Sequence, residues 1–242
     1  MNKDTLERLL LRHYEIARSP TGRWLLNLHV EYQRWRARWL AEGTAACKRS
    51  FDVLGSLALL LLFSPLLLLI ALLVWIEDGG PVFFAQTRVG QYGREFIMYK
   101  FRSMCLEAEE RLKELLRQNQ HKEGVTFKIK DDPRITCVGR WLRKFSFDEL
   151  PQLYNVLIGD MSLVGPRPPL PREVAMYSLA HRRRLATKPG ITCIWQISGR
   201  ANIDFSGQVR LDVAYIENQS FWSDLQILAR TVPAVLSGKG AC

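Results

Sequence analysis

The sequence predicts a mainly helical α+β protein, held on one face of a membrane by a re-entrant helix-break-helix hairpin, as in monotopic membrane proteins. Three observations support this fold class. Twenty-four residues between Asp52 and Glu77 carry no formal charge, and Ser64-Pro65 interrupts them near the middle. Segments with helical periodicity dominate the rest of the chain, whereas stretches rich in β-forming residues are few and short. We therefore expect a membrane hairpin joined to a small domain with short strands.

Composition narrows the class of protein. Hydrophobic residues make up 48% of the chain and charged residues 24%, a globular balance that excludes a polytopic membrane protein. The net charge is +10, and basic residues exceed acidic ones on both sides of the apolar run. Such a surface suits nucleic acid, anionic lipid or phosphorylated substrates; beside an apolar anchor we favour the last two and expect no nucleic-acid partner. Five cysteines without C-x-x-C spacing indicate a reducing compartment and no zinc site.

Residues 1–47 form the first predicted segment, in which two amphipathic helices break near residues 19–22. The second helix interleaves Trp24, Trp35 and Trp39 with arginines. Tryptophan with arginine is typical of helices that lie in a membrane interface. The alternative is that this stripe packs on the globular part or pairs with a second subunit in a homodimer.

Residues 48–77 form the predicted hairpin, kinked at Ser64 and Pro65. Proline removes a backbone donor and clashes with the preceding turn, and the serine hydroxyl could satisfy the freed carbonyl. Each arm has about twelve residues, roughly 18 Å of helix, whereas the hydrocarbon core is roughly 30 Å thick. A sharply bent pair of arms would therefore enter and leave by the same face.

The charges that flank the hairpin agree with this topology. Lys48 and Arg49 precede it, and further basic residues follow soon after it. Because cytoplasmic flanks carry the excess of lysine and arginine, both ends are expected in the cytoplasm. A kinked helix that spans the membrane remains the alternative. Asp52, at the start of the run, could cap the first arm, pair with a neighbouring arginine or stay solvated.

Residues 78–242 form the third predicted segment, a cytoplasmic domain. Two short strands flank a Gly-Gln-Tyr-Gly turn within residues 82–102. The proline-rich stretch at 159–171 excludes regular structure, because its prolines fix φ and remove donors. Helices are expected at 105–118, 138–158 (with a break), 172–186 and 207–236, and a turn followed by a strand in "KPGITCIWQISGR".

The stretch "RKFSFDELPQLYNVLIGD" carries the strongest chemical signal, because Asp148 and Glu149 stand where a helix is expected to begin. The structural alternative is capping, either by Asp148 as N-cap or by Ser146 and Glu149 as a capping box. Adjacent carboxylates could instead hold Mg²⁺, which prefers carboxylates and substrate phosphates. A carboxylate can also act as a nucleophile and form an acyl phosphate.

Four cations accompany this carboxylate pair. Arg167 stands on a proline loop, where a rigid backbone would present it to a phosphate, although a structural turn with a solvated arginine explains it equally well. Arg200 follows a glycine, and Lys100 and Arg102 stand on the same side of a strand end. Two carboxylates with several cations suit phosphoryl transfer, in which positioning and charge neutralisation dominate.

These motifs carry a family resemblance. The stretches "KRSFDVLGSLALLLLFSPLLLL", "FIMYKFRSM", "FSFDELPQLYNVLIGDMSLVGPRPPLP", "IWQISGR" and "LDVAYIEN" resemble, in the same order, the bacterial sugar transferases. These are monotopic phosphoglycosyl transferases, and the resemblance runs from about Lys48 to the C-terminus. It implies transfer of a hexose-1-phosphate from a UDP-sugar to undecaprenyl phosphate, giving undecaprenyl diphosphate-sugar and UMP. It also implies a Mg²⁺ requirement and a covalent phosphosugar on an aspartate.

The resemblance also assigns residues. It makes Asp148 the nucleophile and Glu149 its acidic partner at the metal, and it places Arg167 in a Pro-Arg-Pro motif that meets the uridine nucleotide. The cations near the phosphates, together with an acid of the active-site region, are Lys100, Arg200 and Asp212. Cys193 departs from the pattern, because glycine is expected in the "PGIT" turn, and this puts the local backbone in question.

The implied location is the cytoplasmic face of the bacterial inner membrane, with both termini cytoplasmic and inner-membrane lipid around the hairpin. Glucose or galactose is favoured as the sugar, because the motif set is most similar to members that initiate exopolysaccharides. The rival class is a non-catalytic scaffold at the membrane interface. It accounts for the anchor and the basic charge, but not for the two carboxylates beside a rigid arginine loop and "SGR".

Overall fold

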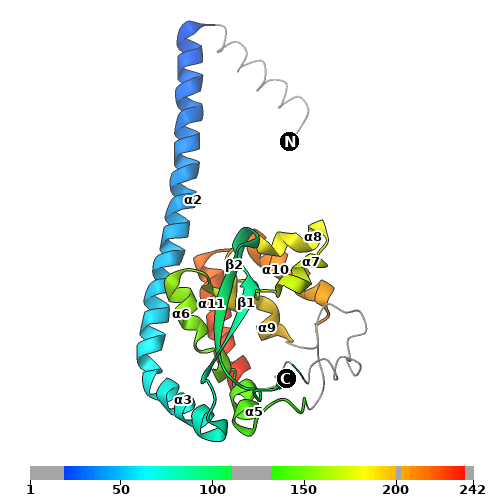
Figure 1. Cartoon of the computed structure of the whole chain (residues 1–242). Coiled ribbons are helices and arrows are strands. Elements are labelled where there is room, and N and C mark those ends of the chain that lie inside the picture. The colour runs from blue at the N-terminus through cyan, green and yellow to red at the C-terminus, as the bar shows by residue number, and fades with distance from the viewer. Residues whose placement is uncertain (1–18, 109, 111–131, 200–202, 238–242) are drawn as a thin grey trace. The chain divides into compact units, whose positions relative to one another are not determined.

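The computed structural model describes residues 19–108, 110, 132–199 and 203–237 (Figure 1). Within them the chain is mainly helical with a few short strands, as the sequence predicts. It divides into two compact units, Met1–Ser50 and Phe51–Cys242. The helix expected before residue 19 lies outside the described residues.

The first unit contains most of helix α2 (Pro20–Leu62), which continues into the second. The helix begins at the predicted break, where the Ser19 hydroxyl accepts a hydrogen bond from the Gly22 amide at 2.9 Å. Serine before proline is a favourable start, because the hydroxyl caps a free amide and the proline lacks one. Trp24 and Trp35 are exposed.

The hairpin bends between α2 and α3 (Ser64–Asp78). The segments Gly43–Leu62 and Ser64–Asp78 meet at 62° and pass a length and composition test for membrane insertion only as a pair; among the described helices, none passes it alone. The Ser64 hydroxyl donates to the Leu61 carbonyl at 2.8 Å. This is the carbonyl that the amide of residue 65 would have bonded, so the serine compensates for the donor that Pro65 lacks.

Asp52 fastens the first arm to the body of the second unit. Its carboxylate accepts hydrogen bonds from the Ser162 hydroxyl and the Leu163 amide, each at 3.0 Å, and all three residues are buried. The expectations that Asp52 caps the arm, pairs with an arginine or stays solvated are therefore wrong. They rested on neighbours in sequence, whereas the partners lie 110 residues further along the chain.

Two small sheets frame the domain. Strands β1 (Phe83–Val89) and β2 (Glu95–Phe101) pair antiparallel around the predicted turn, which contains the 3-10 segment η1 (Gln91–Gly93). Strands β3 (Ser162–Val164) and β4 (Gly190–Thr192) pair in parallel. β3 corrects the expectation that 159–171 lacks regular structure, because its prolines begin only after Val164.

After β2, the described helices are shorter and more numerous than the sequence predicts, whereas α2 runs as one helix through the predicted boundary at residue 47. The expected helix at 172–186 is broken into three pieces and that at 207–236 into two. The strand expected in "KPGITCIWQISGR" forms as β4 but ends at Thr192, and a helix follows it from Ile194. Residues 109 and 111–118 of another expected helix lie outside the described part. The helical elements after β2 whose bounds fall within the described residues are α5 (Cys137–Lys144), η3 (Phe147–Glu149), α6 (Gln152–Ile158), α7 (Pro171–Ala175), α8 (Leu179–Arg182), η4 (Arg183–Leu185), α9 (Ile194–Ser198), α10 (Phe205–Glu217) and α11 (Phe221–Ser237).

Two hydrophobic clusters hold these elements together. The larger joins the strands to α6, α10 and α11 through residues such as Met98, Val156 and Tyr215. The smaller contains Ile70 and Val74 of α3 together with Phe101 and Leu142, so it packs α3 and α5 against the end of β2. Figure 1 shows α5 beside the end of α3 that leads to the strands.

Candidate active site

Two predicted cations, Lys100 and Arg167, come from distant parts of the chain and contact the carboxylate of Glu149. Lys100, near the end of β2, places its ammonium 2.7 Å from Oε1 of Glu149, and both side chains are 14% exposed. Arg167, on the proline loop, places Nη1 3.0 Å from the same oxygen and is 35% exposed. Asp148 is buried directly beside Glu149. The arrangement is a carboxylate pair within a cationic surround, with Arg167 reaching solvent.

The backbone at this pair is a tight turn rather than a helix start. Ser146 adopts a left-handed conformation (φ 55°), and η3 follows it; α6 begins only at Gln152. The Ser146 side chain makes no capping hydrogen bond, so the capping box does not form. Asp148 lies inside η3, and the N-cap position of α6 is Pro151, so Asp148 is not the N-cap either. A non-glycine residue with positive φ costs energy that the surrounding structure must supply, and such residues cluster at functional sites.

Asn155 fixes the distance between Lys100 and Glu149. Its amide side chain is fully buried, accepts from the Tyr99 amide at 3.0 Å and donates to the Ile97 carbonyl at 2.7 Å. These two bonds tie α6, which follows Glu149, to the strand that carries Lys100. No sequence pattern indicates this role, because an asparagine within an expected helix usually points to solvent.

Arg88 fixes the position of the proline loop in a similar way. Its guanidinium donates to the Pro168 carbonyl at 3.0 Å, and the Val89 amide donates to the Pro169 carbonyl at 2.9 Å. The loop that carries Arg167 is thereby bonded to β1. Burial, with the nearby Arg167 charge, lowers the pKa of Arg88 to about 10, so it stays protonated at neutral pH.

The surroundings of the two carboxylates shift their pKa values in opposite directions. Burial alone would raise the pKa of Glu149, but Lys100 and Arg167 outweigh it and hold that pKa below its usual range. For Asp148 burial dominates, and its pKa is raised although Lys100 and Arg143 act in the opposite direction. Glu149 is therefore a permanent anion, whereas Asp148 is a carboxylate whose charge is incompletely compensated.

The carboxylate pair is compatible with a magnesium ion but does not enclose one. Within the described residues, no group of three or more acidic, histidine or cysteine side chains could hold a metal by itself. Mg²⁺ commonly takes one or two carboxylates and completes its shell with substrate phosphates and water. Asp148 and Glu149 together supply the one or two carboxylates that such a site takes from the protein.

Two other predicted residues lie in different surroundings. Arg102 comes directly after the end of β2 at Phe101, and its guanidinium pairs with Asp78 at the end of α3. Asp212 is 1% exposed and pairs with Arg184, which also donates to the Tyr177 hydroxyl at 3.1 Å. The structure thus gives both residues ion-pair partners other than the carboxylate pair and its cations.

Arg200 lies outside the described residues. Arg143, which no sequence motif indicates, lowers the pKa of Asp148, and its Nη1 is buried without a hydrogen-bond partner in the described part of the chain. The backbone at Cys193 shows whether a residue other than glycine distorts the "PGIT" turn. Its φ of −151° is extended backbone that any residue adopts, so the replacement of glycine causes no strain.

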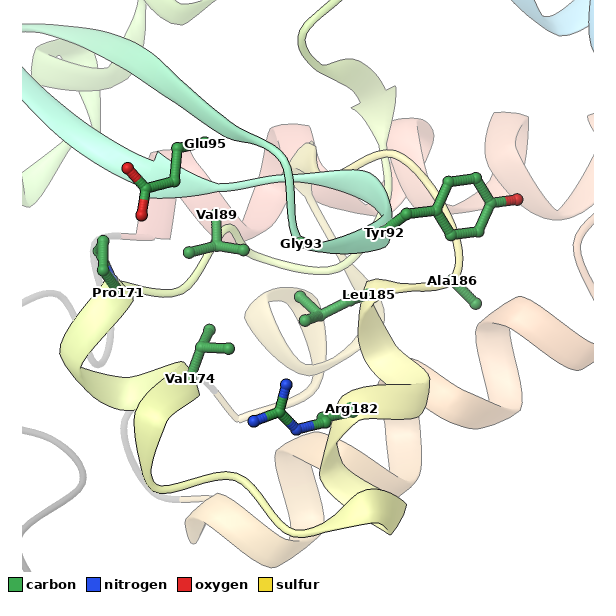
Figure 2. Close-up of a pocket in the computed structure, with 9 residues that line it drawn as sticks. All are labelled: Val89, Tyr92, Gly93, Glu95, Pro171, Val174, Arg182, Leu185 and Ala186. Atoms are coloured by element: carbon green, nitrogen blue, oxygen red, sulfur yellow. The ribbon is translucent and has the colours of Figure 1, made fainter.

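A separate cavity of about 440 Å³ lies between the β1–β2 turn and the segment from α7 to η4. Figure 2 shows Val89, Val174 and Leu185 around it, with the charged groups of Glu95 and Arg182 on opposite sides. The residues that line it include none of the predicted site residues, so the carboxylate pair belongs to a different surface.

Known proteins resemble most of this chain. A family model described as bacterial sugar transferase matches residues 43–238. A galactosyl transferase CpsE of Streptococcus agalactiae is 51% identical over 80% of this chain and 43% of its own length. The exopolysaccharide production protein ExoY of Rhizobium meliloti is 46% identical over 80% and 87%, respectively.

An undecaprenyl-phosphate galactose phosphotransferase of Salmonella typhimurium is also 46% identical, over 80% of this chain and 41% of its own length. The chain thus spans less than half of two of these relatives and most of the third.

Proposed function

Because the chain belongs to the bacterial sugar transferase family, we propose that it transfers a hexose-1-phosphate from a UDP-sugar to undecaprenyl phosphate. The products are undecaprenyl diphosphate-sugar and UMP, and the step opens the assembly of an exopolysaccharide. The relative from Salmonella is named for transfer of galactose phosphate to the same lipid. The single observation that carries the proposal is the contact of Lys100 and Arg167 with Glu149, directly beside Asp148.

In the proposed first step, a carboxylate oxygen of Asp148 attacks the phosphorus that bears the sugar. The new O–P bond forms as the bond to the bridging oxygen breaks, and UMP leaves with that electron pair. In the second step a phosphate oxygen of the lipid attacks the same phosphorus, and Asp148 leaves as a carboxylate. Covalent catalysis usually accelerates a reaction by dividing one difficult transfer into two easier displacements.

The surrounding residues have distinct proposed roles. Arg167 is partly exposed on a loop bonded to β1, so it can meet the donor diphosphate without a large ordering cost. Lys100 is buried and holds Glu149 in place while neutralising part of the charge at Asp148. Mg²⁺, held by Asp148 and Glu149, would neutralise the phosphate charge when bound. Arg143 offers an unused donor close to the nucleophile.

The proposed setting is the cytoplasmic face of the bacterial inner membrane, with the bent hairpin inserted from that side. This placement lets one domain use a water-soluble donor and a lipid acceptor without crossing the bilayer. UDP-galactose is the first donor to test, because two of the relatives are named for galactose. UDP-glucose is the second.

The deciding experiment measures UMP release from a UDP-sugar with undecaprenyl phosphate and Mg²⁺. Asp148→Asn should abolish turnover and covalent labelling from donor radiolabelled in its sugar, while flotation with vesicles stays unchanged. Asp160→Asn, a matched change after α6, should keep full activity.

Full turnover in Asp148→Asn would refute the nucleophile assignment. Absence of UMP release from the unaltered protein with every donor would favour the scaffold alternative. EDTA should stop release, and Mg²⁺ should restore it.

A further inference from the structure

An aromatic cluster covers the outer side of α5 and ends at the carboxylate pair. It consists of Trp141, Phe145 and Phe147, whose ring centroids lie 5.2–5.9 Å apart. Trp141 is 43% exposed, and the two phenylalanines are half-buried. Phe147 also packs against the smaller hydrophobic cluster, so the three contacting rings extend from that core to a solvent-exposed apolar surface at Trp141, which is suited to an apolar ligand.

The cluster is continuous with the membrane hairpin. The adjacent side of α5 buries Leu142 against Ile70 and Val74 of α3, and Phe147 packs against the same group. The Val138 amide at the start of α5 also donates to the Glu77 carboxylate at 3.1 Å. α5 is thus fixed to the arm of the hairpin whose other residues, Leu68, Leu69, Leu72, Trp75 and Ile76, are exposed apolar side chains.

The other end of the cluster reaches the nucleophile. Phe147 precedes Asp148 in the 3-10 turn η3. Lys144 lies at the same end, with its ammonium 5.5 Å from the centre of the Phe145 ring. An apolar surface therefore runs from the inserted hairpin to the reacting carboxylate, with a cation beside it.

We propose that this cluster binds the isoprene units next to the phosphate of the lipid acceptor, an inference that rests on the proposed function. The acceptor phosphate must reach Asp148, and the first part of its chain then leaves the bilayer. Rings that continue from the hairpin would keep that part out of water. A bulk phospholipid has no reason to follow the surface as far as Asp148, whereas the acceptor must do so.

The test separates acceptor binding from donor chemistry. Trp141→Ala and Trp141→Phe are assayed in lipid nanodiscs for the KM of undecaprenyl phosphate and of farnesyl phosphate. The burst of UMP formed without acceptor is measured in parallel. The control is Trp222→Ala, because Trp222 is a more exposed tryptophan on α11.

We expect Trp141→Ala to raise the KM for undecaprenyl phosphate about tenfold and Trp141→Phe to restore most of it. The KM for farnesyl phosphate should rise by the same factor, because the cluster contacts the units nearest the phosphate. The UMP burst should keep its amplitude, which shows that the variant is folded and loads donor. Trp222→Ala should change neither quantity.

Three results would overturn the inference. The first is an unchanged acceptor KM in Trp141→Ala with unchanged vesicle flotation, which would leave the cluster without a ligand. The second is an unchanged acceptor KM with weakened flotation, which would assign the cluster to bulk lipid. The third is a diminished burst, which would assign it to the donor site. Absence of a burst in the unaltered protein would instead refute the proposed covalent step and remove the basis of this inference.

Discussion

Replacement of Asp52 should loosen the first arm of the hairpin from the domain. Asp52→Ala removes the acceptor for the Ser162 hydroxyl and the Leu163 amide, both buried at 3.0 Å from the carboxylate. A buried donor left without a partner costs about 1–3 kcal/mol, so two of them cost roughly 2–6 kcal/mol. The hydroxyl can turn toward another acceptor, which sets the expected loss of unfolding free energy at about 3 kcal/mol.

A loss of this size is measurable by thermal unfolding in detergent. For a domain of this size, 1 kcal/mol corresponds to about 2–4 °C, so the midpoint should fall by about 6–12 °C. Asp52→Asn keeps a carbonyl acceptor and should lose about half as much. Glu95→Ala, at an exposed carboxylate, should stay within about 0.5 kcal/mol.

A double-mutant cycle isolates the contact. Ser162→Ala removes the hydroxyl donor, so adding it to Asp52→Ala should cost less than its effect in the unaltered protein. The difference should fall within about 0.5–3 kcal/mol. The reasoning would be refuted by a midpoint shift below about 2 °C in Asp52→Ala or by strictly additive effects in the cycle.

Two further predictions concern cations. Lys100→Met should move the acid limb of the UMP-burst rate to higher pH, because Lys100 lowers the pKa of Asp148, which burial raises; Lys100→Arg should leave the limb in place, and an unshifted limb in the methionine variant would contradict this. Arg102→Gln should destabilise the protein by about 2 kcal/mol through loss of its pair with Asp78, without changing the KM for the donor. A donor KM raised as much as in Arg167→Gln would return Arg102 to the substrate site.

The hairpin bend could be predicted because its causes are local. Proline lacks the donor for one helical hydrogen bond, and the residue that compensates for it, Ser64, is its immediate neighbour. The β1–β2 turn could be predicted for the same reason, since Gly90 and Gly93 punctuate it within the stretch itself. In both cases the covalent properties of adjacent residues decide the structure.

The features that the sequence did not predict depend on where separate elements end. Lys100 and Arg102 alternate correctly for one strand face, but the strand stops between them and only Lys100 reaches Glu149. Ser146 and Glu149 match a capping box, yet the left-handed backbone at Ser146 replaces the helix start with a tight turn. A local sequence pattern indicates such residues as candidates for a site or a cap. The point at which each strand or helix begins or ends then decides which of these roles the residue has.

The candidate site itself illustrates the limit most clearly. Its charged residues could be named from the types that phosphate chemistry requires, but nothing near Glu149 in sequence indicates that Lys100 and Arg167 meet at one of its oxygens. Asn155 and Arg88 make that meeting possible, by bonding the helix after Glu149 to β2 and the proline loop to β1. Both act through backbone groups, which any sequence provides, so no pattern of partner side chains reveals them. For a site built from charges on three elements, the sequence therefore predicts the chemistry, whereas only the fold shows the geometry.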